Sequence, residues 1–137
     1  MKQKKIALAI VDDHQIVIDG LKSLLQGHEQ FVVVHETTHP EDMCRLLEIK
    51  PAEILLTDVM MPVMNGNEFC HLLKTDLDTS HIPVLMMTAL TSVESQMEGF
   101  ETGADDYMVK PFDDRILILR IRNLLESRRI LRDKFAR

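Results

Sequence analysis

The sequence alternates five times between a short apolar run and a longer stretch with helical periodicity. Apolar runs of this length are typical of parallel strands that are covered on both faces. They lie at residues 6–11, 31–34, 54–57, 82–87 and 107–109. Regular alternation of strands and helices favours one parallel sheet with helices on both sides. No linker or repeat divides the chain, so we predict an α/β fold in one domain.

The stretches between the strands carry apolar residues at three- and four-residue spacing, as amphipathic helices do. Proline and glycine mark their ends, because proline starts a helix well but cannot continue one, and glycine adopts the conformation that closes it. These markers are Gly27, Pro40, Pro51, Gly66 and Gly103. We expect the last helix to begin near Phe112, with Ile116, Leu117, Ile121, Leu124 and Leu125 on its buried face.

Composition excludes several classes of protein. Hydrophobic residues make up 45% of the 137 residues and charged residues 28%, which is ordinary for a globular domain and not for a disordered chain. The net charge of -6 argues against direct nucleic-acid binding by this domain. No apolar run approaches the ~20 residues that span a bilayer, and no secretory signal is recognisable. We therefore expect no membrane insertion of this segment and a cytoplasmic location.

Four of the predicted strands end in residues that can carry chemistry. They are Asp12 and Asp13, Asp58, Thr88 and Lys110, in chain order. Because the carboxyl ends of parallel strands meet at one edge of the sheet, these side chains should converge in one crevice. Asp58 is the most informative of them, since ordinary packing gives no reason for a carboxylate at the end of so apolar a run.

The residue types at this edge suit phosphoryl chemistry. Clustered carboxylates repel one another and resist ionisation unless a cation is near. Oxygen ligands of this kind suit Mg²⁺, and an ammonium and a hydroxyl would each contact a phosphoryl oxygen. Taken singly, an aspartate can cap a helix and a lysine can be solvated. It is the combination at one sheet edge that indicates a phosphoryl acceptor at Asp58.

Four motifs together resemble the receiver domains of two-component response regulators. They are the segments 11–14, 58–66, 87–89 and 103–112, and the resemblance extends from about Ile6 to Leu125. It implies a flavodoxin-like (βα)5 fold, a three-layer sandwich around a parallel five-stranded sheet in the order 2-1-3-4-5. The resemblance also implies that Asp58 accepts a phosphoryl group from a histidine kinase or its phosphohistidine domain.

The same resemblance assigns a metal site. Asp13, Asp58 and the backbone carbonyl of Met60 would bind Mg²⁺, and Asp12 would contribute through water. Lys110 would pair with the phosphoryl group. His14 follows the acid pair, where it could support the site from behind the ligands or simply start a helix.

A conformational switch is implied as well. Thr88 would be the switch hydroxyl and Tyr107 its aromatic partner. Their change on phosphorylation would alter the face formed by the fourth helix, the fifth strand and the fifth helix. By analogy, that face could also form a homodimer.

Met60 and Leu90, two residues beyond Asp58 and Thr88, are apolar and cannot orient an attacking water. We therefore expect a comparatively long-lived phospho-Asp58.

The end of the chain differs in charge. We divide it into a receiver domain at 1–127 and a basic helical extension or linker at 128–137. This junction resembles that of Bacteroides-type hybrid sensor kinases, in which a helix-turn-helix domain follows and controls transcription. The alternatives are a freestanding receiver, or one that passes its phosphoryl group to a histidine phosphotransfer partner.

Two classes of alternative function fit less well. A phosphohydrolase that forms an aspartyl phosphate would carry a second acid two residues after its nucleophile, and that position is Met60. A nucleotide or flavin binder would carry a glycine-rich loop after the first strand, and none is present. We therefore expect no enzymatic activity beyond self-phosphorylation and autodephosphorylation.

Overall fold

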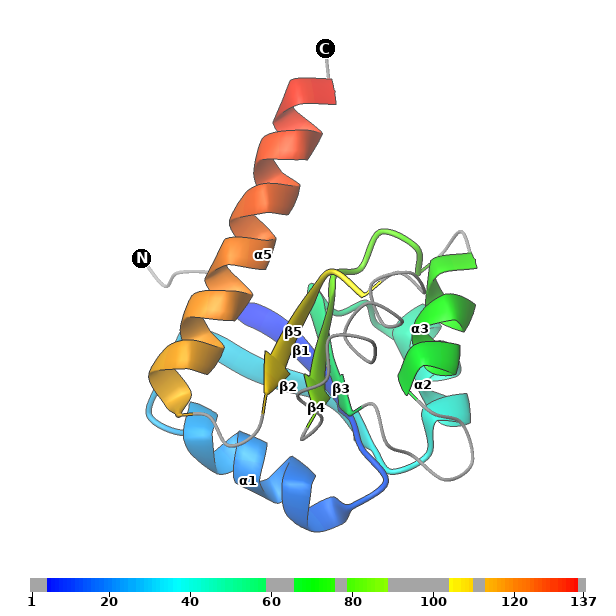
Figure 1. The fold of residues 1–137 in the computed structure, drawn as a ribbon, viewed down its shortest axis with the longest axis vertical. Helices are drawn as coiled ribbons and strands as arrows, with labels where there is room; N and C mark the ends of the chain where they lie inside the picture. The colour runs from blue at the N-terminus through cyan, green and yellow to red at the C-terminus, as the bar shows by residue number, and fades with distance from the viewer. Residues whose placement is uncertain (1–4, 59–65, 76–78, 89–103, 110–112, 136–137) are drawn as a thin grey trace.

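A parallel sheet of five strands organises the chain (Figure 1). The computed structural model describes residues 5–58, 66–75, 79–88, 104–109 and 113–135. The strands are β1 (Ile6–Val11), β2 (Phe31–Thr37), β3 (Ile54–Asp58), β4 (Val84–Thr88) and β5 (Asp106–Val109). They pair in parallel in the order β2-β1-β3-β4-β5. The predicted sheet and its strand order are confirmed.

Helices cover both faces of this sheet. They are α1 (Gln15–Leu25), α2 (Pro40–Ile49), α3 (Gly66–Thr75) and α5 (Asp114–Phe135). In Figure 1, α1 and α5 lie on one side of the sheet, and α2 and α3 on the other. The predicted three-layer arrangement is therefore present. The helix expected before Gly103 lies outside the described residues.

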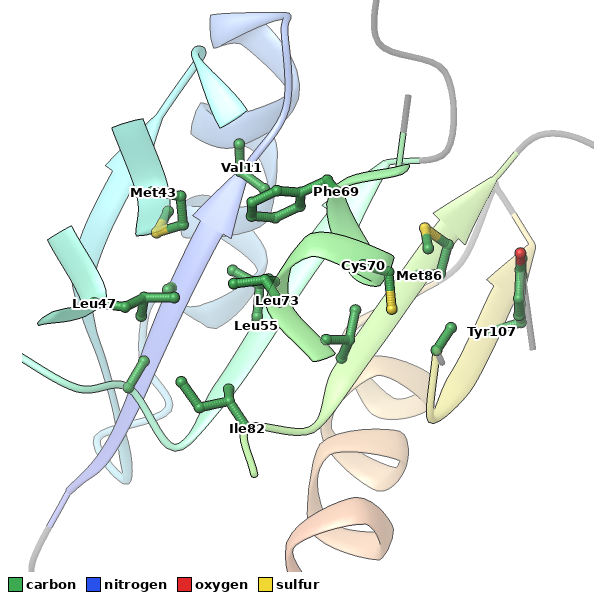
Figure 2. Close-up of a cluster of buried hydrophobic side chains, with 14 residues drawn as sticks. Val11, Met43, Leu47, Leu55, Phe69, Cys70, Leu73, Ile82, Met86 and Tyr107 are labelled. Carbon is green, nitrogen blue, oxygen red and sulfur yellow. The ribbon is translucent and has the colours of Figure 1, made fainter. Parts of the chain in front are cut away.

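Alternation of side chains along each strand builds two separate cores. In β1, Leu8 and Ile10 pack toward α1 and α5, whereas Ala9 and Val11 pack toward α2 and α3. Figure 2 shows the second of these clusters, with Phe69 of α3 against the sheet. Each fully buried large apolar side chain contributes about 1.5–3 kcal/mol. Both faces of the central strands are therefore dry, which explains their nearly continuous apolar sequence.

Helix ends follow the predicted markers. Gly27 has a φ of 89°, a left-handed conformation that favours glycine, directly after the end of α1. Pro40 stands in the first turn of α2, where its missing N–H costs no helical hydrogen bond. Lys50 is extended and closes α2 just before Pro51, because the residue that precedes a proline is disfavoured in the helical conformation.

The outer strands differ from the prediction at their ends. β2 continues from Val34 to Thr37 through polar residues, which an edge strand tolerates because part of it faces solvent. β4 begins at Val84, after Pro83, because proline has no N–H to donate to the ladder. The sequence prediction placed the start of β4 at Ile82, two residues too early.

Helix α5 begins two residues later than expected and continues without a break to Phe135. Asp113 caps it, since its Oδ1 accepts the N–H of Ile116 at 3.1 Å. This hydrogen bond, together with Arg115, lowers the pKa of the Asp113 carboxyl. Leu117 and Ile121 are buried as predicted. The prediction for Ile116 was wrong, because its side chain is 45% exposed on the outer side of the helix.

Among the described residues, no helix combines the length and the apolar character needed to cross a bilayer.

The two cysteines pack as expected. Cys70 is fully buried in the cluster beneath α2 and α3 (Figure 2), and Cys44 is half-buried against the same cluster. Burial raises the pKa of the Cys70 thiol to about 11. The Cys70 thiol is therefore protonated at neutral pH and behaves as a small apolar side chain.

A network of charged side chains lies at the amino ends of the strands, around Asp105. Asp105 Oδ2 accepts the backbone N–H of Val84 at 2.7 Å and the ammonium of Lys74 at 2.9 Å. Asp105 Oδ1 accepts Arg128 Nη2 at 2.9 Å. One carboxylate thus joins β4, α3 and the far half of α5. Since its side chain is 23% exposed, these hydrogen bonds are partly shielded from water.

We predict that Asp105→Asn lowers the free energy of unfolding by about 2–4 kcal/mol, because it leaves the partly buried Lys74 without its charged partner. Urea denaturation at neutral pH measures the change. Asp19→Asn is the control, because Asp19 is exposed on α1, where it accepts a hydrogen bond from the Gln15 amide. A loss no larger than that of the control would contradict this role of Asp105.

Candidate functional site

The strand register brings the predicted strand-end residues to one edge of the sheet. Val11 is paired with Thr57, so Asp12 and Asp58 occupy the next positions of neighbouring strands. Asp58 is itself paired with Met87 of β4. Thr88, at the end of β4, is paired with Val109 of β5. The ends of β1, β3, β4 and β5 therefore lie at the same edge of the sheet.

Two of the carboxylates at this edge are deeply buried. Asp12 is 0% exposed and Asp58 is 7% exposed, although both are acidic. Asp12 Oδ1 accepts the backbone N–H of His14 at 3.0 Å, and its own N–H donates to Thr37 of β2. The backbone therefore holds Asp12 firmly, and the buried end of β3 holds Asp58.

Asp13 and His14 stand beside Asp12 at the entrance of α1. The Asp13 side chain is 17% exposed and that of His14 is 62% exposed. His14 Nδ1 lies 3.0 Å from Asp13 Oδ1 and 3.5 Å from Asp12 Oδ1. One donor atom from each of the three residues lies within 4.8 Å of the others.

This donor set fits a divalent cation. Two carboxylates a few ångströms apart repel by about 1–4 kcal/mol, depending on solvent exposure. The Asp13 Oδ1 atom is buried and accepts no hydrogen bond from the described residues, although His14 Nδ1 is near it. A hard cation such as Mg²⁺ would neutralise the charges and occupy that oxygen. Asp12 and Asp13 are therefore suitable residues to hold one.

Other predicted site residues are described only in part. Tyr107 is buried, packs with the cluster beneath α2 and α3, and is paired with Met86 of β4 (Figure 2). The backbone of Thr88 closes β4, but its side chain is outside the described part of the structure. Met60 and Lys110 also lie outside it, although Lys110 directly follows Val109 at the end of β5.

Comparison with known proteins identifies the family. The model of the response regulator receiver domain matches residues 8–122. The chain belongs to the response regulator receiver family. It is a component of two-component signalling, in which receiver domains act as phosphorylation-dependent switches and interact with histidine kinases.

Similar proteins support this membership. The chain is 36% identical over 135 residues to "Histidine kinase P4" of Formosa agariphila. The matched region covers 98% of this chain but 10% of that protein. The chain is also 43% identical over 124 residues to "Response regulator PleD" of Caulobacter vibrioides, and this match covers 90% of the chain and 27% of that protein. The chain thus spans a minor part of both relatives.

A solved structure shows the same fold. It is a protein described as a response regulator from Chloroflexus aurantiacus, with a TM-score of 0.83 and 31% identity. The similarity covers 90% of this receiver and 99% of that chain. The sheet order and the layers described above are therefore those of a receiver domain.

The sequence left open whether His14 supports the acid pair or simply starts a helix. The sequence showed only that a histidine follows two aspartates. Its adjacency to the acids was the one available signal, and adjacency does not determine where an imidazole points. In the structure the backbone of His14 is extended (φ -111°, ψ 114°), and its Nδ1 lies 3.0 Å from Asp13 Oδ1.

Charge repulsion in the acid pair generates a prediction. In EDTA, Asp13→Asn should raise the free energy of unfolding by about 1 kcal/mol, since the repulsion it relieves exceeds the ~0.3–1 kcal/mol that an acid contributes at a helix start. Added MgCl₂ should stabilise the wild type and leave Asp13→Asn nearly unchanged. Thermal unfolding with and without Mg²⁺ measures both effects.

Asp19→Asn again serves as the control, because Asp19 is an exposed aspartate of α1 that lies outside the acid cluster. This control should respond to Mg²⁺ as the wild type does. Equal stabilisation of the wild type and Asp13→Asn by Mg²⁺ would show that the ion binds elsewhere.

Proposed function

We propose that the chain is a phosphorylation-dependent signalling switch in which Asp58 is the phosphoryl acceptor. The observation that carries this proposal is the register of β1 and β3, which sets the buried Asp58 beside the buried Asp12 at the carboxyl edge of the sheet. An acid pair beside a third carboxylate is a costly arrangement for stability alone. Its presence favours a functional role.

The reaction is an in-line displacement at phosphorus. A carboxylate oxygen of Asp58 attacks the phosphorus of a phosphohistidine, an O–P bond forms, and the N–P bond breaks. The leaving imidazole keeps the electron pair and takes up a proton. Because this reaction needs mainly positioning and charge neutralisation, a rigid strand end is well suited to hold the nucleophile.

Three groups would neutralise the transferred charge. Asp13, Asp58 and the carbonyl of Met60 would hold Mg²⁺, with Asp12 acting through water, and the bound ion would supply positive charge to the phosphoryl oxygens. Lys110 would pair with another phosphoryl oxygen, and the Thr88 hydroxyl would donate to a third. Thr88 is paired with Val109 on the last rung of β4 and β5, and Lys110 follows Val109 in the sequence, which supports this assignment.

Thr88 and Tyr107 would pass the change to an output. Val109, Ile116 and Leu119 are apolar residues of β5 and α5 that are 37%, 45% and 58% exposed. These exposed apolar side chains support a role for β5 and α5 in binding a partner or a second copy of the chain, at the face that the family resemblance assigns to the fourth helix, β5 and α5. Because the chain belongs to the receiver family, this face is the first candidate for the signalling surface.

The output itself depends on the parent protein. We propose that the domain works in the cytoplasm and that its parent is a hybrid histidine kinase that controls transcription through an attached helix-turn-helix domain. The similarity to a segment of "Histidine kinase P4" supports this origin, with 128–137 as the basic helical linker at the end of α5. The second candidate is a phosphorelay receiver that passes its phosphoryl group to a histidine phosphotransfer partner.

The acceptor role predicts a covalent product. Incubation with acetyl phosphate and Mg²⁺ should add one phosphoryl group, detected by intact-protein mass spectrometry. Asp58→Asn should abolish the gain, because an amide is a poor nucleophile at phosphorus. Asp19→Asn should be labelled as the wild type is. Persistent labelling of Asp58→Asn, or rapid turnover of unrelated phosphate esters by the wild type, would contradict the proposal.

The apolar residue at position 60 predicts slow loss of the phosphoryl group. Met60→Asn introduces an amide that can orient an attacking water, so phospho-Asp58 should decay several-fold faster than in the wild type. The decay is followed by mass spectrometry after removal of acetyl phosphate. Met60→Leu, which adds no polar group, should decay at the wild-type rate. An unchanged or slower decay in Met60→Asn would exclude this explanation.

A further inference from the structure

The side chain of His14 is not needed to cap the helix that it precedes. His14 occupies the N-cap position of α1, yet its side chain makes no capping hydrogen bond. Its backbone N–H donates to Asp12 Oδ1 at 3.0 Å, which ties the residue to the acid pair. The ring then lies with Nδ1 toward Asp13 and Asp12.

The distances at this corner suit ligands of one metal ion. Donor atoms that share an ion with bonds of about 2.1 Å lie about 3.0 Å apart in octahedral and about 3.4 Å apart in tetrahedral geometry. His14 Nδ1 lies 3.0 Å from Asp13 Oδ1 and 3.5 Å from Asp12 Oδ1. The imidazole can therefore join Asp13 on one ion without a rearrangement of the backbone.

We propose that His14 Nδ1 is a direct ligand of the ion held by Asp13, so that the site favours divalent transition ions such as Co²⁺ and Zn²⁺ over Mg²⁺. The inference rests on the acid pair as the metal site of the proposed function. Imidazole nitrogen suits Co²⁺ and Zn²⁺, whereas Mg²⁺ prefers oxygen ligands. His14 binds as the neutral tautomer whose Nε2 carries the proton, and its 62% exposure leaves that N–H open to water.

A simple hydrogen bond from His14 to Asp13 is the competing explanation, and a second histidine separates the two. His39 is also an N-cap with extended backbone and a 62% exposed side chain, and its Nδ1 lies 3.8 Å from Glu41. It has a carboxylate neighbour and stands at the start of α2, outside the cluster of Asp12, Asp13 and His14. His39→Gln is therefore a matched control for His14→Gln.

The experiment measures the affinities of Mg²⁺ and Co²⁺ by calorimetry in the wild type, His14→Gln and His39→Gln. His14→Gln should weaken Co²⁺ binding about tenfold or more, since it removes a ligand that suits this ion, and should change Mg²⁺ binding less than about twofold. His39→Gln should leave both affinities unchanged. In ¹⁵N spectra of the wild type, Zn²⁺ should shift the Nδ1 resonance of His14 and no other histidine.

Three results would overturn the proposal. They are an unchanged Co²⁺ affinity in His14→Gln, an equal loss of Co²⁺ and Mg²⁺ affinity in that variant, or a Zn²⁺-induced shift at a different histidine. Failure of the proposed function is seen separately, as absence of acetyl phosphate labelling of Asp58 in the wild type with Mg²⁺. If Asp58 is labelled and His14→Gln leaves the Co²⁺ affinity unchanged, only the inference about His14 is overturned.

Discussion

The burial of mutually repelling carboxylates at one edge of the sheet is the constraint on which the rest of the structure depends. Asp12 and Asp58 are held on neighbouring rungs by the pairing of β1 with β3, and both are almost wholly removed from solvent. Such an arrangement costs stability without a counter-ion. The dry cores on both faces of the sheet offset that cost and keep the strand ends rigid.

The two edges of the sheet are built in opposite ways. At the amino ends of the strands, the Asp105 carboxylate meets Lys74, Arg128 and a backbone N–H, so its charge is compensated within the protein. At the carboxyl ends, the acids crowd together beside an exposed imidazole. The ion pairs of Asp105 stabilise the fold at one edge, and the cluster of Asp12, Asp13 and His14 offers donor atoms for a cation at the other. The ion pairs of Asp105 and the proposed site thus lie at opposite ends of the strands.

Much of the fold could be predicted because local sequence and tertiary environment agree. Strands covered on both faces must be apolar, so β1 and β3 are recognisable without a structure. The failures occur where the environment decides. Ile116 faces outward although the helical pattern allowed it to be buried, and β2 continues through polar residues because it is an edge strand. The local sequence pattern does not determine where a strand lies in the sheet.

The sequence by itself determined the alternation of strands and helices, and it determined which residue types stand at the strand ends. Both follow from local chemistry, because apolar runs, helical periodicity and proline or glycine markers act over a few residues. Only the tertiary structure decided that Asp12 and Asp58 are neighbours across the sheet, that Tyr107 is buried, and that His14 points at the acids. These placements depend on hydrogen bonds between strands and on the packing of distant segments.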